Sequence, residues 1–193
     1  MDKVNIRIDV LSIGLFGLAV GALTLGLIQV EFIPSPDAIA VSIICLTFGG
    51  LVQIVAGSID VRHHDQLGGT ALTMYGYFWT TVFTIKILNL SQGFHWDEIL
   101  FLPIVLIYFL FSVVMVYLTA HKNLTLMLLH MAITFTFGFD IFLKLGYEYG
   151  LYVGLGHIAI GCVAFYHATA TLMNRFLGAD KLPLGRAPLR IDQ

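Results

Sequence analysis

Six long stretches of the chain carry almost no charge, and each is close to the length of a helix that crosses a membrane. They cover residues 10–30, 38–59, 67–88, 98–119, 124–143 and 151–174. About 20 residues of helix are needed to cross the hydrocarbon layer of a bilayer. The pattern therefore predicts an all-α membrane protein, in which a six-transmembrane-helix bundle forms a single transmembrane domain over residues 1–193.

Short polar segments separate these stretches and mark where the helices end. Residues 31–37 contain two prolines, and residues 91–97 contain a tryptophan, which is typical of the membrane interface. Pro103 falls in the first turns of the fourth predicted helix, where its missing N–H is tolerated. Residues 175–193 are expected to form an exposed cytoplasmic tail.

Lysine and arginine are unevenly divided between the connections. Eight lie in the N-terminal segment, the second and fourth connections and the tail: Lys3, Arg7, Arg62, Lys122, Arg175, Lys181, Arg186 and Arg190. The other two, Lys86 and Lys144, lie at the opposite ends of the predicted helices. Because positive charge close to membrane spans stays in the cytoplasm, both termini are predicted to be cytoplasmic in a multi-pass protein of the cell membrane.

Composition narrows the class of protein further. Hydrophobic residues make up 58% of the chain and charged residues 11%, against about 25% charged in soluble domains. The net charge of -2 supplies no clustered basic face for a nucleic acid. Cys45 and Cys162 each sit in an apolar stretch without a ligand-spaced neighbour. We therefore expect membrane lipid as a partner, and no nucleic acid, metal, cofactor or enzymatic activity.

Polar side chains inside the spans mark a candidate path, because an unsatisfied polar group in lipid is unfavourable. Gln53 and Asp60 are seven residues apart, which places them on nearly the same helix face, where they would line an inner vestibule. For Asp60, the alternative is a solvated carboxylate paired with Arg62. Hydroxyls that would bind a carboxylate, or instead bond back to their own helix, belong to Thr70, Thr73, Thr134 and Thr136.

Other ionisable groups in the spans allow two interpretations. His130, His157 and His167 would carry a proton together with an anion, or would make structural hydrogen bonds to neighbouring helices. Asp140 and Lys144 have the i,i+4 spacing of a helical ion pair near the outer end of the fifth helix. The sequence places no arginine or lysine deep in a span to hold an anion.

Two neighbouring segments carry the most specific pattern in the chain. Residues 48–60 read FGGLVQIVAGSID, and residues 68–79 read GGTALTMYGYFW. This pattern resembles the signature of the acetate uptake transporter family, which includes bacterial succinate-acetate permeases and yeast acetate permeases. The matching positions are Gln53, Ala56, Gly57, Tyr75, Gly76, Phe78 and Trp79. Residues 14–15, Asn174 and residues 182–185 extend the resemblance over nearly the whole chain.

The chain departs from the family pattern at two places. Residues 9–15 read DVLSIGL where the family usually reads NPAPLGL, so both prolines are missing. Asp60 stands where the family usually has glutamate. Neither change alters the spacing into the membrane.

The resemblance implies a narrow pore through each protomer of a ring-shaped homohexamer, closed midway by three apolar or aromatic side chains. By position, these constriction residues are Leu18, Tyr75 and Met131. The substrate path is expected to include Gln53, Asp60, Thr70, Thr73 and Thr134. Core packing is the alternative role for the constriction residues.

The function implied by the resemblance is that of a channel-like permease. Acetate and related small carboxylates are the expected substrates, with succinate as a further candidate. A pore built mainly from uncharged side chains also fits small neutral solutes, so a channel for urea or short amides is the alternative.

Overall fold

The computed structural model describes residues 10–34, 37–92 and 97–189, and within these ranges the secondary structure is helical, with no strand. The elements are α1 (Leu11–Gln29), α2 (Ala38–Ile44), η1 (Cys45–Val52), α3 (Gln53–Arg62), α4 (Gln66–Gln92), η2 (Glu98–Phe101), α5 (Leu102–Ala120), α6 (Leu124–Lys144) and α7 (Gly150–Leu177). Three of them, α2, η1 and α3, follow one another without a break. Asp37 caps this rod, because its side chain accepts hydrogen bonds from the N–H groups of Ile39 and Ala40 at 2.9 and 3.0 Å.

Each charge-poor stretch of the sequence corresponds to one long helical rod in the described chain. Five of these rods are long and apolar enough to cross a membrane: Leu11–Gln29, Ala38–Arg62, Ile99–Ala120, Leu124–Lys144 and Gly150–Leu177. The sixth, α4, has 27 residues but is more polar, because glycines, threonines and a terminal glutamine interrupt its apolar residues. This polar helix also contains the second of the two family-like segments.

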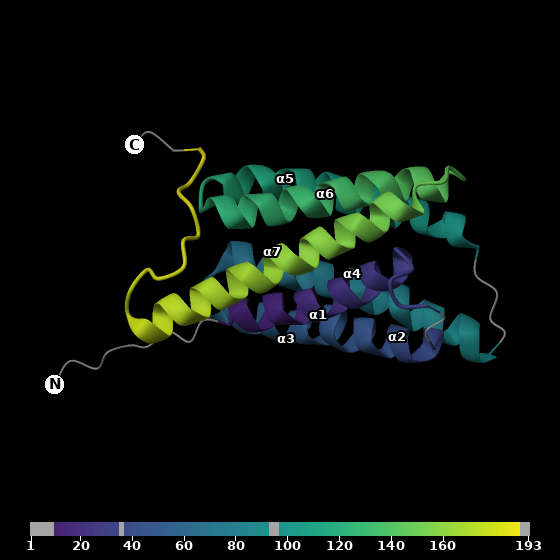
Figure 1. The fold of residues 1–193 in the computed structure, drawn as a ribbon, viewed down its shortest axis with the longest axis horizontal. Helices are drawn as coiled ribbons and strands as arrows, with labels where there is room; N and C mark the ends of the chain where they lie inside the picture. Colours follow the sequence, from purple (N-terminus) through teal and green to yellow (C-terminus); the bar gives the residue numbers. More distant parts are fainter. Residues whose placement is uncertain (1–9, 35–36, 93–96, 190–193) are drawn as a thin grey trace.

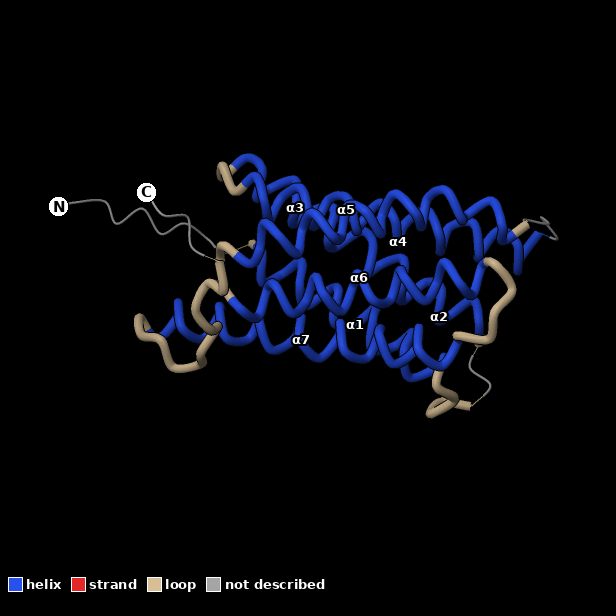
Figure 2. The backbone as a smooth tube through the Cα atoms, turned by 90° about the horizontal axis from the view of Figure 1, so that it is seen from above, coloured by secondary structure: helices blue, strands red, loops and turns tan. Residues whose placement is uncertain are grey.

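The rods form one elongated bundle whose connections lie at its two ends (Figures 1 and 2). One end holds the start of α1, the α3–α4 turn, the α5–α6 turn and the segment that follows α7; we call it the tail end. The α1–α2, α4–α5 and α6–α7 connections lie at the opposite end. Neighbouring rods pack as α1 with α7, α3 with α4, α5 with α6 and α6 with α7.

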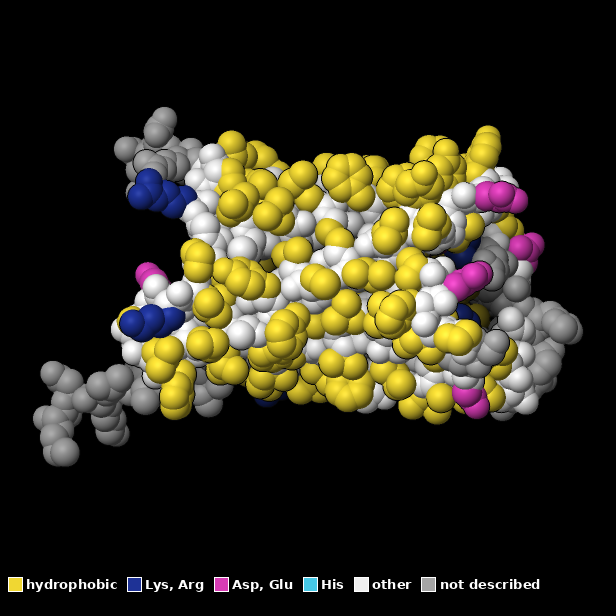
Figure 3. Space-filling view, viewed as in Figure 1, with side chains coloured by type: hydrophobic (Ala, Val, Ile, Leu, Met, Phe, Trp, Pro, Cys, Tyr) yellow, Lys and Arg dark blue, Asp and Glu magenta, His cyan; other side chains and the backbone are white. Residues whose placement is uncertain are grey.

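Charged side chains gather at the ends of the bundle, and apolar side chains cover its middle (Figure 3). In that view lysine and arginine are prominent at the tail end, whereas most acidic groups lie at the opposite end. An apolar surface around the middle of the bundle is what contact with the hydrocarbon layer of a bilayer requires. The distribution of the basic residues agrees with the uneven division seen in the sequence.

Glycines let the rods approach to backbone contact. A Cβ atom placed on Gly76 of α4 would lie 2.9 Å from the carbonyl oxygen of Gly50 and 2.9 Å from the nitrogen of Ile54. On the other side of the bundle, a Cβ on Gly26 of α1 would lie 2.8 Å from the carbonyl oxygen of Gly154 in α7. These contacts fix α4 against the α2–α3 rod and α1 against α7.

The segment after α7 crosses the tail end of the bundle (Figure 1), where most of its residues are exposed and a few hydrogen bonds hold it. Asn174 holds it, since its Nδ2 donates to the Leu182 carbonyl at 2.7 Å and its Oδ1 accepts from the Leu182 N–H at 2.8 Å. The N–H of Thr125 then donates to the carbonyl of Leu184 at 3.1 Å, at the start of α6. These bonds give a physical role to Asn174 and residues 182–185.

Candidate pore

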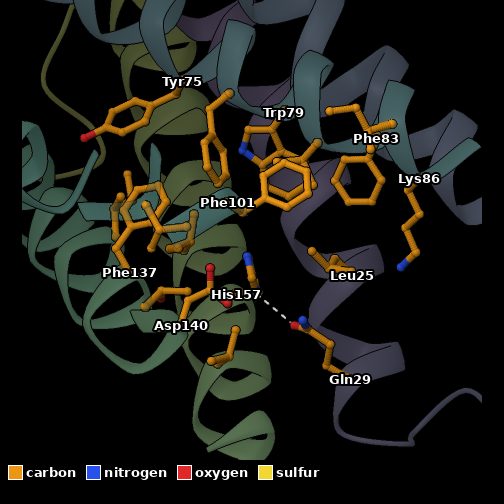
Figure 4. Close-up of a pocket in the computed structure, with 18 of the residues that line it drawn as sticks. Leu25, Gln29, Tyr75, Trp79, Phe83, Lys86, Phe101, Phe137, Asp140 and His157 are labelled. Carbon is orange, nitrogen blue, oxygen red and sulfur yellow. Dashed lines mark hydrogen bonds between the residues drawn. The ribbon is translucent and has the colours of Figure 1, made fainter. Parts of the chain in front are cut away.

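A cavity that we call the larger cavity opens toward the opposite end of the bundle and has a volume of about 300 Å³. Its wall is rich in aromatic side chains, which come from α4, η2 and α6 (Figure 4). These are Tyr75, Phe78, Trp79, Phe83, Phe101 and Phe137. A volume of this size lies at the lower end of the range for small-molecule sites.

The rim of the larger cavity carries charged and polar groups: Lys86, Asn89, Asp140 and Lys144. The Lys86 Nζ lies 5.9 Å from the centre of the Phe83 ring, and the Lys144 Nζ lies 6.0 Å from that of Phe101. Lys86 was not among the lining residues predicted from the sequence. Its position 11 residues after Tyr75, about three helical turns, would have placed both on one face of α4.

A hydrogen bond between α1 and α7 crosses the wall of the larger cavity (Figure 4). His157 Nδ1 lies 2.8 Å from Gln29 Oε1, and an amide oxygen only accepts, so Nδ1 carries the hydrogen. The same imidazole ring lies 5.9 Å from the Trp79 ring in an edge-to-face arrangement. His157 therefore makes a structural bond, as one of the two interpretations of the histidines expected.

The smaller cavity lies toward the tail end and has a volume of about 30 Å³, enough for about one water molecule. Aliphatic side chains form most of its wall, together with Gln53, Thr119 and His130. Asp65 and Lys122 also line it, and the Lys122 Nζ lies 3.4 Å from the Asp65 Oδ1 in a partly exposed ion pair. This pair links the start of α4 to the α5–α6 turn.

Three side chains line both cavities and separate them: Leu18 of α1, Tyr75 of α4 and Ile133 of α6. We call these three residues the waist. Their exposed fractions are 3%, 4% and 5%, so each is buried. The two cavities thus lie in series, with one apolar and aromatic constriction between them.

Met131, the third constriction residue predicted from the sequence, lines neither cavity and is only half-buried. Two residues along a helix turn a side chain by about 200°, so Met131 and Ile133 face different sides of α6. The buried face of α6 consists of Leu126, Leu129, His130, Ile133, Thr136 and Phe137. Its spacing of three and four residues includes Ile133 and leaves out Met131.

Tyr75 is held in place through its hydroxyl. Its Oη lies 3.0 Å from the Oγ of Ser112, and the Ser112 hydroxyl donates to the carbonyl of Tyr108 at 2.7 Å. The Tyr75 hydroxyl is therefore the donor in its bond with Ser112. The Tyr75 ring also lies 5.3 Å from the ring of Phe111 and 6.0 Å from that of His130. The hydroxyl of Tyr75 is thus bonded to the protein, and its aromatic ring forms part of the waist.

Gln53 lines the smaller cavity, as the sequence predicted for an inner vestibule, and its side chain is fully buried. It follows η1, a π-helical segment of the kind often found at functional sites. The Gln53 Nε2 donates to the carbonyl of Gly49 within this segment. The Gln53 Oε1 is buried and has no hydrogen-bond partner among the described residues. Asp60 is also buried, but it lines neither cavity.

The three threonines predicted to lie on the path line neither cavity. Thr70 is exposed, Thr73 packs against Gly57, and the Thr134 hydroxyl donates to the carbonyl of His130 at 2.8 Å. Thr119 lines the smaller cavity, and Thr136 lines the larger one. The sequence does not distinguish the threonines that line a cavity from those that do not, because it leaves open which face of each helix turns toward the cavities.

The described residues contain no group of three or more histidine, cysteine or acidic side chains arranged to hold a metal ion. Cys45 is buried and Cys162 is exposed, and neither forms a disulfide.

Comparison with known proteins places this arrangement among relatives. A sequence profile of the GPR1/FUN34/yaaH family matches residues 7–185, which is nearly all of the chain. Among solved structures, the bacterial acetate channel SatP is similar, with a TM-score of 0.85 and 21% sequence identity, over 93% of this chain and 99% of that chain. A comparison with curated protein sequences gives no match. The profile match confirms the resemblance seen in the sequence, and the structural likeness shows a shared fold.

Proposed function

The chain belongs to the GPR1/FUN34/yaaH family, and from this premise we propose that it is a channel-like permease for acetate and related small carboxylates. The observation that carries the proposal is the series of two cavities within one protomer, joined at the waist. The larger cavity admits a small acid, whereas the waist excludes hydrated ions because its side chains are apolar or aromatic. Acetate as the substrate is supported by the similarity to SatP, a bacterial acetate channel.

We further propose that all six rods cross the cell membrane with both termini in the cytoplasm. In that orientation the larger cavity faces outward, and the ion pair of Asp65 and Lys122 lies at the cytoplasmic mouth of the smaller cavity. Ring-shaped homohexamers are the assembly that the family resemblance implies. Apolar side chains exposed along the middle of the bundle, such as Ile107, Leu110 and Phe135, are available to contact lipid and neighbouring protomers.

Small neutral solutes such as urea or short amides are the second candidate substrates. One observation favours them: among the described residues that line the cavities, the cationic side chains are Lys86, Lys122 and Lys144, and all three lie at the mouths. The waist itself offers an anion no positive charge. Succinate, with two carboxylates, would be less favoured than acetate at such a constriction.

Uptake into proteoliposomes tests the proposal. Purified protein is reconstituted, and the uptake of radiolabelled acetate, succinate and urea is compared with that into protein-free vesicles of the same lipid. We expect the protein to accelerate acetate uptake more than urea uptake. Acetate uptake equal to that of protein-free vesicles, together with accelerated urea uptake, would replace this proposal with the neutral-solute channel.

A further inference from the structure

The hydroxyl groups that line the cavities or bond to the waist donate their hydrogens to protein acceptors. The Tyr75 hydroxyl donates to Ser112, and the Ser112 hydroxyl donates to the Tyr108 carbonyl. Thr119 donates to the carbonyl of Met115 at 2.6 Å, and Thr136 donates to that of Ala132 at 2.8 Å. Each of these hydroxyls therefore presents lone pairs, rather than hydrogens, to a passing solute.

His130, on the side of the smaller cavity, also donates its ring hydrogen to a protein acceptor. Its Nδ1 lies 2.9 Å from the carbonyl oxygen of Leu126, and a carbonyl only accepts, so Nδ1 carries the hydrogen. In the neutral ring, Nε2 is then an acceptor. On the side of the larger cavity, the bond from His157 to Gln29 fixes the same tautomer.

Gln53 presents an acceptor most clearly, because the two ends of its amide differ in their bonding. The amide nitrogen bonds to the carbonyl of Gly49 in the π-helical segment, which fixes the orientation of the side chain. The amide oxygen is buried and has no partner among the described residues, and Gln53 is one of the residues that line the smaller cavity. A buried acceptor without a partner is unfavourable, and a ligand that donates a hydrogen to it would recover the lost free energy.

Positive charge lies far from the waist on both sides. Lys86 lies 11 residues beyond Tyr75 in α4, while Lys122 and Lys144 lie 11 residues before and after Ile133. At 1.5 Å per residue, the Cα atoms of Lys86 and Lys144 are about 16 Å along their helices from Tyr75 and Ile133, and Lys122 lies beyond the start of α6. A carboxylate that reached the waist would leave these charges behind and would meet acceptors, which repel it.

We propose that the species passing the waist is the protonated, uncharged carboxylic acid, and that the Gln53 Oε1 accepts its O–H hydrogen. The proton crosses as part of the solute, so no net charge moves through the waist. This inference rests on the proposed function and names the form of the substrate.

The ionisable groups near the waist come from four helices. They are Tyr75 on α4, Tyr108 on α5 and His130 on α6, with His167 on α7 bonded to Thr125 at 2.7 Å. His157, Asp140 and the lysines face the larger cavity, and Asp65 with Lys122 faces the smaller one.

An imposed membrane potential separates the acid from its anion. Potassium gradients with valinomycin set the potential in proteoliposomes at constant pH, and initial uptake of radiolabelled acetate is measured. Uptake into vesicles with the Ile133→Phe variant, whose waist is filled, is subtracted as leakage through lipid. We expect the remaining uptake to change by less than twofold between -100 and +100 mV. An anion gains or loses a factor of roughly 50 in driving force per 100 mV, so an uptake that follows the potential would overturn the inference.

A pair of glutamine variants tests the role of Gln53. Gln53→Met keeps the length of the side chain but removes the acceptor, and we expect acetate uptake to fall by roughly three- to tenfold, the effect of one hydrogen bond. Gln66→Met, at the exposed start of α4, is the matched control and should change uptake by less than twofold. Uptake that is unchanged in Gln53→Met would remove Gln53 from the path. If Gln53→Met fails to fold, the potential measurement on the unaltered protein still decides the form of the solute.

The two proposals fail in different ways. If the unaltered protein does not accelerate acetate uptake at any potential, the permease function is wrong, and this inference falls with it. If acetate uptake is accelerated but follows the imposed potential, the permease function stands and only the uncharged form is wrong.

Discussion

The two cavities are lined in part by the same helices, yet they differ tenfold in volume. The larger cavity, of about 300 Å³, has aromatic rings and a charged rim, whereas the smaller one, of about 30 Å³, is mostly aliphatic. Acetate has four non-hydrogen atoms and does not fit a space for about one water molecule. The structure is therefore open to a small acid on one side of the waist and closed on the other.

The difference arises from how closely the rods approach each other. Beside the smaller cavity, Gly57 and Gly69 bring α3 and α4 into backbone contact, and the ion pair of Asp65 and Lys122 ties the start of α4 to the α5–α6 turn. Around the larger cavity, aromatic rings pack edge to face and hold the rods apart, as Phe78 and Phe137 do with ring centres 5.0 Å apart. For the proposed function, the tail-end side would have to widen before acetate could pass.

Filling the waist should abolish the connection between the cavities, and this is the largest effect that we expect. Ile133→Phe adds an aromatic ring where both cavities meet, so acetate uptake into proteoliposomes should fall more than tenfold. Met131→Phe, two residues away and outside both cavities, is the matched control and should retain most of the uptake. The reverse result would show that Met131, the residue predicted from the sequence, forms the constriction.

The close approach of α4 and the α2–α3 rod should be sensitive to a single methyl group. Gly76→Ala places a Cβ 2.9 Å from two backbone atoms of that rod, which should lower stability by about 1–3 kcal/mol through overpacking. Gly150→Ala meets no atom within 4 Å and should leave stability nearly unchanged. Thermal unfolding of both variants in detergent measures the difference. Equal melting temperatures would show that the backbone contact at Gly76 does not contribute to stability.

Much of the fold was predictable because hydrophobic length is a strong local signal. The charge-poor stretches gave the positions of the rods within a few residues, and the family resemblance gave Leu18 and Tyr75 as lining residues. Two details were missed. The π-helical segment before Gln53 has no local sequence signature. The attachment of the exposed segment after α7 depends on hydrogen bonds from Asn174 and from Thr125, which join positions far apart in the sequence.

The candidate site was less predictable because a cavity is a property of several helices at once. Lys86 was interpreted only as a marker of topology, and Lys144 as one also paired with Asp140, although both lysines line the larger cavity. Thr70, Thr73 and Thr134 were selected by chemistry alone, and none of them lines either cavity. For α6, the spacing of buried positions at 126, 129, 130, 133, 136 and 137 would have selected Ile133 instead of Met131.

Removing the ring of Tyr75 should make the waist less selective for size. Tyr75→Ala is expected to raise the uptake of lactate relative to acetate by roughly threefold to tenfold, because a pocket distinguishes solutes that differ by a few atoms by factors of this order. Tyr75→Phe keeps the ring and loses only the bond to Ser112, so its ratio should stay within twofold. Competition between the two radiolabelled acids gives the ratio directly. An unchanged ratio in Tyr75→Ala would remove Tyr75 from the constriction.

The smallest effect is expected at the rim of the larger cavity. A positive potential at Lys86 raises the local concentration of acetate anion, but it lowers that of protons by the same factor, so the local concentration of the uncharged acid does not change. Lys86→Gln should therefore alter acetate uptake by less than twofold, both at low ionic strength, where the Debye length is about 30 Å, and near 0.15 M, where it is about 8 Å. Lys181→Gln, outside both cavities, is the control. A loss of several-fold in Lys86→Gln that disappears as salt is added would show that the rim collects the anion, and that the charged form is the one delivered to the waist.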